Sequence, residues 1–128
     1  MNFEQATLSI RRGDSIKVVQ EKLAISASPD RLPEVEEVVY FYHLEFLGFW
    51  VFFKESGLAY SIRFENPYPY TIEGVSIGKT KEEVLAIRGS VFRNMPIPDG
   101  KTRWIYDQPQ FLRIDFNKET GRVEKVFR

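Results

Sequence analysis

His43 and Glu45 are the two side chains in this sequence that are best placed for acid–base chemistry. Residues two apart on an extended strand point to the same face, so this pair could act as a general base, with Arg63 as a further polar group of a pocket. No nucleophile accompanies them in the sequence, and a single histidine does not make a metal cluster. We therefore expect a protein that is not an enzyme and holds no cofactor or metal. A small-ligand-binding or enzymatic domain that uses this pocket is the alternative.

The segment 74–80, Gly-Val-Ser-Ile-Gly-Lys-Thr, has the residue types of a phosphate-binding loop. That loop needs four residues between its first glycine and the Gly-Lys pair, so that successive backbone N–H groups surround a phosphate. Here three residues separate them. The spacing therefore argues against nucleotide binding.

The composition excludes several functional classes. The chain has 128 residues, of which 43% are hydrophobic and 15% aromatic, and its 18 basic residues balance 18 acidic ones. A protein that binds nucleic acid through the phosphate backbone carries a basic excess, so we expect no nucleic-acid partner. The absence of cysteine excludes disulfides and thiolate zinc sites.

The apolar runs of the chain are short. None approaches about 18 residues, and the polar start of the sequence lacks the pattern of a signal peptide. We therefore expect no membrane partner and a cytoplasmic location.

Capping residues and apolar spacing predict one helix in each half of the chain. Ser15 can cap a helix that carries Ile16, Val19 and Leu23 and ends before residue 26. Thr80 and Glu83 form a capping box for a second helix, which stops at residue 89.

Strands are expected after each helix. The first half has candidate strands at 38–46, 49–54 and 58–64, and the second half at 102–106, 111–117 and 122–127. The sequence thus predicts an α+β fold, with helices packed on one face of an antiparallel sheet that is continuous or concave.

The two halves show a faint internal repeat. Residues 10–15 match residues 75–80 at an offset of 65, and the same offset pairs Val19 with Val84 and Phe46 with Phe111. Two prolines in the segment 66–70 favour an extended connector. We predict a first repeat at 1–66 and a second at 71–128.

Residues 74–89 resemble the helical signature of the BamE-like (SmpA/OmlA) domain family, in which a G-x-[ST]-[KR]-x-[EQ]-V stretch precedes a hairpin sheet. Residues 104–106 and 121–126 look like the aromatic strand and final strand of that family. Two such units in tandem resemble the beta-lactamase inhibitor protein family, whose duplicated halves form a concave sheet that grips another protein. The resemblance implies a scaffold that holds proteins, and it implies no chemistry. The anchor cysteine of BamE lipoproteins is missing, so their outer-membrane role is not expected here.

Alternation along the strands separates a core row from an outer row. The residues expected in the core are Val38, Tyr40, Tyr42, Leu44, Phe46, Phe49, Val51, Phe53, Leu58, Tyr60, Ile62, Phe64, Leu112, Ile114 and Phe116. The outer row of a sheet with one wet side should be polar, but it contains Phe41, Trp50 and Phe52.

Aromatic rings mixed with charged side chains on a solvent face are typical of protein-binding surfaces. The predicted partner-binding residues are Phe41, His43, Glu45, Trp50, Phe52, Arg63, Phe111 and Arg113. The same rings would be ordinary core if a loop or the other half covered them, and a homodimer could form through the same patch.

The charge distribution adds a second hint about the partner. Residues 1–64 have a balance of −2, with Asp30, Glu34, Glu36 and Glu37 before the first strand, and residues 65–128 have a balance of +2. The acidic group is either a solvated loop or a contact for a basic partner such as a nuclease toxin. The sequence thus predicts a protein-binding module, an inhibitor or immunity protein of the toxin–antitoxin kind.

Overall fold

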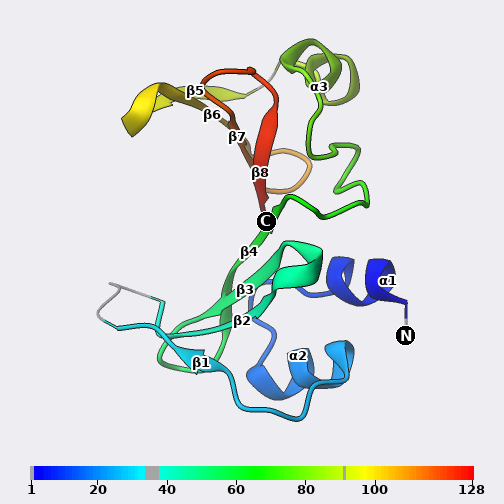
Figure 1. The fold of residues 1–128 in the computed structure, drawn as a ribbon, viewed down its shortest axis with the longest axis vertical. Coiled ribbons are helices and arrows are strands. Elements are labelled where there is room, and N and C mark those ends of the chain that lie inside the picture. Colours follow the sequence, from blue (N-terminus) through cyan, green and yellow to red (C-terminus); the bar gives the residue numbers. More distant parts are fainter. Residues whose placement is uncertain (1, 34–37, 91) are drawn as a thin grey trace. The chain divides into compact units, whose positions relative to one another are not determined.

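The computed structural model describes residues 2–33, 38–90 and 92–128 (Figure 1). The chain divides into two compact units, Met1–Arg63 and Phe64–Arg128, and each contains helix and antiparallel strand. The predicted α+β class is confirmed. That the two units are copies of one ancestral repeat, joined at 66–70, stays a prediction.

Unit 1 begins with two helices and continues with a meander of strands. Its elements are α1 (Phe3–Leu8), α2 (Ile16–Leu23), β1 (Asp30–Arg31), β2 (Tyr40–Leu44), the 3-10 helix η1 (Glu45–Leu47), β3 (Phe49–Phe53) and β4 (Ala59–Glu65), whose last two residues belong to unit 2. The strands lie in the order β1-β2-β3-β4. Both helices lie on one side of β2, β3 and β4 (Figure 1).

The predicted helix after Ser15 is α2. The Ser15 hydroxyl accepts a hydrogen bond from the Val18 N–H at 3.2 Å, which satisfies one of the free amides at the helix start. Val19 and Leu23 are buried, and the helix ends at Ala24, which has left-handed backbone angles. The short helix α1 was not predicted.

Strand β3 is confirmed with its expected alternation, since Phe49, Val51 and Phe53 are buried. Two other parts of the predicted core row are wrong. Phe46 belongs to η1 instead of a strand, and 62% of its surface is exposed. The chain leaves β2 at Leu44 to form the turn toward β3, so its alternation ends there.

The alternation also fails at the start of β4. Leu58 and Tyr60, predicted in the core, are exposed, while Ala59 is buried. Ala59 exchanges backbone hydrogen bonds of 2.8 Å with Gly13 and Asp14. Two residues separate Ala59 from the next buried residue, Ile62, so burial at the start of β4 does not follow a strict alternation.

Unit 2 has one helix and a four-stranded antiparallel meander. Its elements are α3 (Lys81–Arg88), β5 (Arg93–Ile97), the 3-10 turn η2 (Pro98–Gly100), β6 (Lys101–Tyr106), β7 (Leu112–Phe116) and β8 (Val123–Phe127), and the strands lie in the order β5-β6-β7-β8. Leu112, Ile114 and Phe116 are buried as expected. Strand β5 was not predicted. None of the helices formed by the described residues has the length and apolarity needed to cross a bilayer.

The predicted capping box of α3 is present. The Thr80 hydroxyl accepts from the Glu83 N–H at 3.1 Å, and the Glu83 carboxylate accepts from the Thr80 N–H at 3.0 Å. Hydrogen bonds from the backbone and the side chain of Thr80 to the Glu83 carboxylate lower the pKa of Glu83 below its ordinary value.

The glycines of the segment before α3 serve packing and hydrogen bonding within the protein. A Cβ on Gly74 would lie 2.5 Å from the Ile87 side chain, and the backbone there has a positive φ of 89°. The Gly78 N–H donates to the Val123 carbonyl at 2.9 Å. Both glycines have a positive φ, 89° at Gly74 and 94° at Gly78, which residues with a side chain rarely adopt.

Candidate protein-binding surface

Five of the predicted site residues come together on unit 1. His43 on β2 is paired directly with Trp50 on β3, and Phe41 is paired with Phe52. Arg63 on β4 reaches over the same rings. We call these five residues the aromatic face. Because Phe49, Val51 and Phe53 of β3 point to the core, the aromatic face lies on the opposite side of the strands.

Trp50 is the centre of the aromatic face. The His43 ring stacks on it with centroids 3.5 Å apart and planes 12° apart, and the Phe52 ring lies nearly parallel at 5.6 Å. Phe41 lies at 5.6 Å with a tilt of 34°. The Arg63 guanidinium carbon lies 4.4 Å from the Trp50 centroid. Each ring contact contributes about 0.5–1.5 kcal/mol beyond its area burial, so the side chains hold one another in place.

All five side chains of the aromatic face are half-buried. They are neither sealed in a core nor fully extended into solvent. A cation over an aromatic ring at a partly exposed site contributes about 0.5–1 kcal/mol, and more when water is removed from it. A partner that covered this face would therefore strengthen contacts that are already formed.

The other three predicted site residues lie elsewhere. Glu45 belongs to the exposed η1 turn, so the structure does not place it with His43 on strand β2. Phe111 comes just before β7 and Arg113 lies within β7, so both belong to unit 2. Asp30 is exposed on β1, while Glu34, Glu36 and Glu37 of the predicted acidic group lie outside the described residues.

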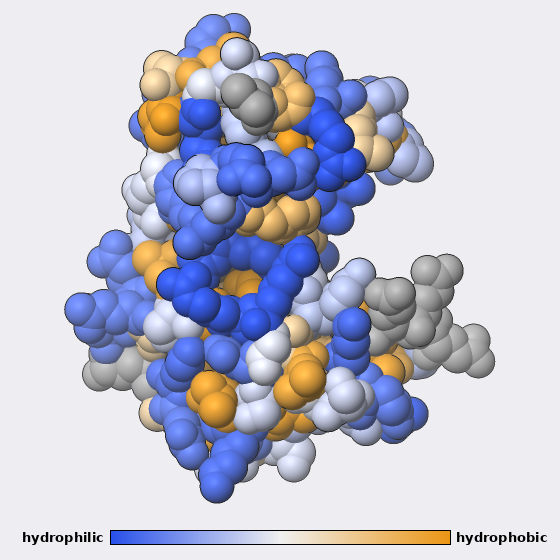
Figure 2. All heavy atoms as spheres, turned by 180° about the vertical axis from the view of Figure 1, so that it is seen from behind, coloured by the Kyte–Doolittle hydropathy of each residue, from blue (hydrophilic) through white to orange (hydrophobic). Residues whose placement is uncertain are grey.

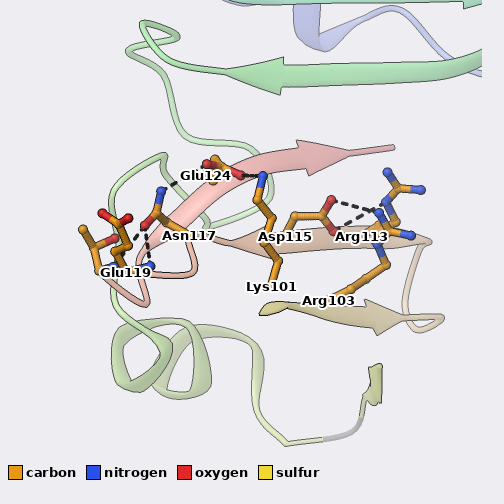
Figure 3. Close-up of polar contacts among 8 residues, drawn as sticks. Lys101, Arg103, Arg113, Asp115, Asn117, Glu119 and Glu124 are labelled. Atoms are coloured by element: carbon orange, nitrogen blue, oxygen red, sulfur yellow. Dashed lines mark hydrogen bonds and ion pairs between the residues drawn. The ribbon is translucent and has the colours of Figure 1, made fainter. Parts of the chain in front are cut away.

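A network of ion pairs on unit 2 was missed in the sequence (Figure 3). Arg103 on β6 binds both carboxylate oxygens of Asp115 on β7, with Nε–Oδ1 at 2.8 Å and Nη2–Oδ2 at 3.0 Å. Arg113 approaches the same carboxylate, with Nε–Oδ1 at 3.7 Å. A signal was present in β7, where charged residues alternate with apolar ones.

Lys101 and Glu124 form a second ion pair beside this network, with Nζ–Oε2 at 2.8 Å. The hydrogen bond from Lys101, assisted by one from Asn117, lowers the pKa of Glu124 although partial burial opposes the shift. The same bond to Glu124 raises the pKa of Lys101.

The Lys101–Glu124 pair makes the stability of unit 2 depend on pH. A carboxyl whose pKa is lowered on folding stabilises the fold above its unfolded pKa, here 4.5, and loses that contribution as the pH falls through the folded pKa. We expect Glu124→Gln to lower the urea midpoint of unfolding at neutral pH and to leave it unchanged in strong acid. Glu119→Gln, at an exposed loop position, is the control. Equal losses at both pH values would show that Glu124 acts by packing instead of charge.

Hydrophobic residues form small separate groups among hydrophilic ones on the face of the molecule drawn in Figure 2.

Comparison with protein-family models, curated proteins and solved structures finds no match to this chain. The resemblance to BamE-like domains and to the beta-lactamase inhibitor protein family therefore stays a prediction. The function has to be argued from the chain's own surfaces.

Proposed function

We propose that this chain is a protein-binding module, an inhibitor or immunity protein that uses the aromatic face to block a partner protein such as a toxin or an enzyme. The observation that carries the proposal is the half-exposed stack of His43, Trp50 and Phe52 with Arg63 over it. Tryptophan, aromatic rings and arginine are the residue types that contribute most to binding at protein interfaces.

The fixed conformation of the stacked side chains also favours binding. Side chains that are free in solution lose conformational entropy when a partner immobilises them, at a cost of about 0.5–1.5 kcal/mol each. Trp50 is held between neighbouring strands by His43 and Arg63, so much of that cost is met on folding. Burying each large ring against a partner would contribute roughly 1.5–3 kcal/mol.

The alternative, a ligand or catalytic site with His43, Glu45 and Arg63, has less support. Such a site needs polar groups that converge on one point. His43 lies flat on the Trp50 ring, Arg63 is directed over the same ring, and Glu45 lies in η1 beyond the end of β2. The polar atoms of the three groups therefore do not converge on one point where a ligand could bind.

The proposal is tested by capture of partners from the native host with three forms of the full chain. We expect the unmodified chain to capture a specific protein and the double variant Trp50→Ala/Phe52→Ala to lose it while keeping its circular dichroism spectrum. Phe46→Ala removes an exposed ring of the η1 turn and should capture the partner normally.

Two results would contradict the proposal. Capture that is unaffected by the double variant would exclude the aromatic face, and loss of folding in that variant would place the rings in the core. The mass in solution separates a third case, since a homodimer that dissociates in the double variant would mean that the face binds a second copy.

A further inference from the structure

The outer face of unit 2 carries two rows of side chains that cross all four of its strands. Residues paired across antiparallel strands point to the same face. The first row consists of Met95, Arg103, Asp115 and Lys125, and the second of Arg93, Ile105, Arg113 and Phe127. We call these eight residues the charged face. The core residues Trp104, Ile114 and Val126 point to the opposite side.

The charged face has an excess of positive charge. Its rows hold four cations against the single carboxylate of Asp115. Asp107 pairs with the Arg93 guanidinium at 3.4 Å. Among the residues that the structure describes, Lys125 has no carboxylate within ion-pair distance. The residue types of the two rows therefore favour an anionic partner.

Two arginines of the charged face are held in fixed positions. The Asp115 side chain is only 6% exposed and binds Arg103 through both of its oxygens. The Arg113 guanidinium carbon lies 3.5 Å from the centroid of the Phe127 ring. Both arginines keep about a quarter of their side-chain surface exposed, at 24% and 27%. The two arginines thus present ordered cations to the solvent, and they would lose little further conformational entropy when a partner binds.

Apolar side chains lie between these cations. Met95 is 41% exposed next to Arg103, and half-buried Ile105 separates Arg93 from Arg113 in the second row. Arginine and methionine are enriched at protein interfaces. A nucleic-acid backbone would use the charge of this face but not its apolar groups, and the chain as a whole has no basic excess.

We propose that the charged face binds an acidic segment of a partner protein. The carboxylates of that segment pair with Arg113 and Lys125, and its apolar side chains contact Met95 and Ile105. Asp115 acts as a positioning residue, because it orients Arg103 and Arg113 without itself meeting the partner. All eight residues of this site belong to unit 2.

The test uses two peptides of equal charge, titrated into the isotopically labelled full chain and followed by the NMR shifts of its amides. One alternates glutamate with glycine, and in the other half of the glycines are leucine. We expect both to shift amides of β6, β7 and β8, with tighter binding of the leucine peptide and weaker binding of both at high salt. Shifts spread over both units would overturn the proposal.

Two charge-reversal variants show whether the peptide binds at the charged face or responds only to the net charge of the protein. Lys125→Glu should weaken binding of the leucine peptide about fivefold, which corresponds to about 1 kcal/mol. Lys17→Glu makes the same change of charge at an exposed position of unit 1 and should weaken it less than about twofold. Equal effects of the two reversals would contradict the proposal. So would an oligothymidine of equal charge that binds more tightly than the peptides, since it would favour a nucleic-acid ligand.

Discussion

Phe49→Ala is expected to lower the free energy of unfolding by about 3–5 kcal/mol, the usual cost of a buried phenylalanine truncated to alanine. Phe49 is completely buried on β3. Its removal takes apolar surface out of the core of unit 1 and leaves a cavity that the neighbouring strands can close only in part. Urea denaturation followed by circular dichroism measures the loss.

Trp50→Ala is the matched comparison, because Trp50 is the next residue on the same strand and points the opposite way. It should cost about 1–2 kcal/mol, since the His43 stack and the Arg63 contact are lost at a partly exposed site. If the two variants cost the same, the aromatic face would be a second core layer and could not be a docking surface.

Asp115→Ala is expected to lower the free energy of unfolding by about 1.5–3 kcal/mol, the range for hydrogen bonds to charged groups. The substitution removes the carboxylate that binds Arg103 in two places and leaves Arg103 and Arg113 facing each other without an anion between them. The loss is measured by thermal unfolding at neutral pH and low salt, where screening of the charges is weakest.

Asp107→Ala provides the control for charge itself. Asp107 also pairs with an arginine, Arg93, but both side chains are about 60% exposed and the contact is 3.4 Å. Exposed pairs contribute about 0.2–1 kcal/mol, so the control should fall in that range. Equal losses in the two variants would mean that burial of Asp115 adds nothing to the contribution of its ion pair to stability.

The two proposed surfaces make different demands on a partner. The aromatic face of unit 1 offers stacked rings with one arginine, and the charged face of unit 2 offers cations separated by apolar side chains. Each face lies within one compact unit and is tested by variants of its own residues.

Local patterns in the sequence determined several parts of this protein. The alternation of 49–53 identified both the buried row of β3 and the rings on its other side. The capping box at Thr80 located the start of α3. These features depend on residues that are close in sequence, and a strand or cap places such residues in the same way in any fold.

Where contacts came from distant segments, only the tertiary structure decided the outcome. Backbone hydrogen bonds join Ala59 to Gly13 and Asp14 at the start of β4, and no local pattern predicts that Ala59 is buried there while Tyr60 is exposed. Strand β5 contains Pro96, which cannot donate to a ladder and therefore hides the strand in a propensity pattern.

Of the two proposed binding surfaces, the sequence predicted one and only the tertiary structure showed the other. Strand alternation alone was enough to place Trp50 and Phe52 on the outer face, because a strand repeats every two residues. The pairing of Arg103 with Asp115 depends on the register between β6 and β7. A shift of one residue would turn one of the two side chains to the opposite face. In the observed register the Trp104 ring also contacts the Phe116 ring, with centroids 4.6 Å apart.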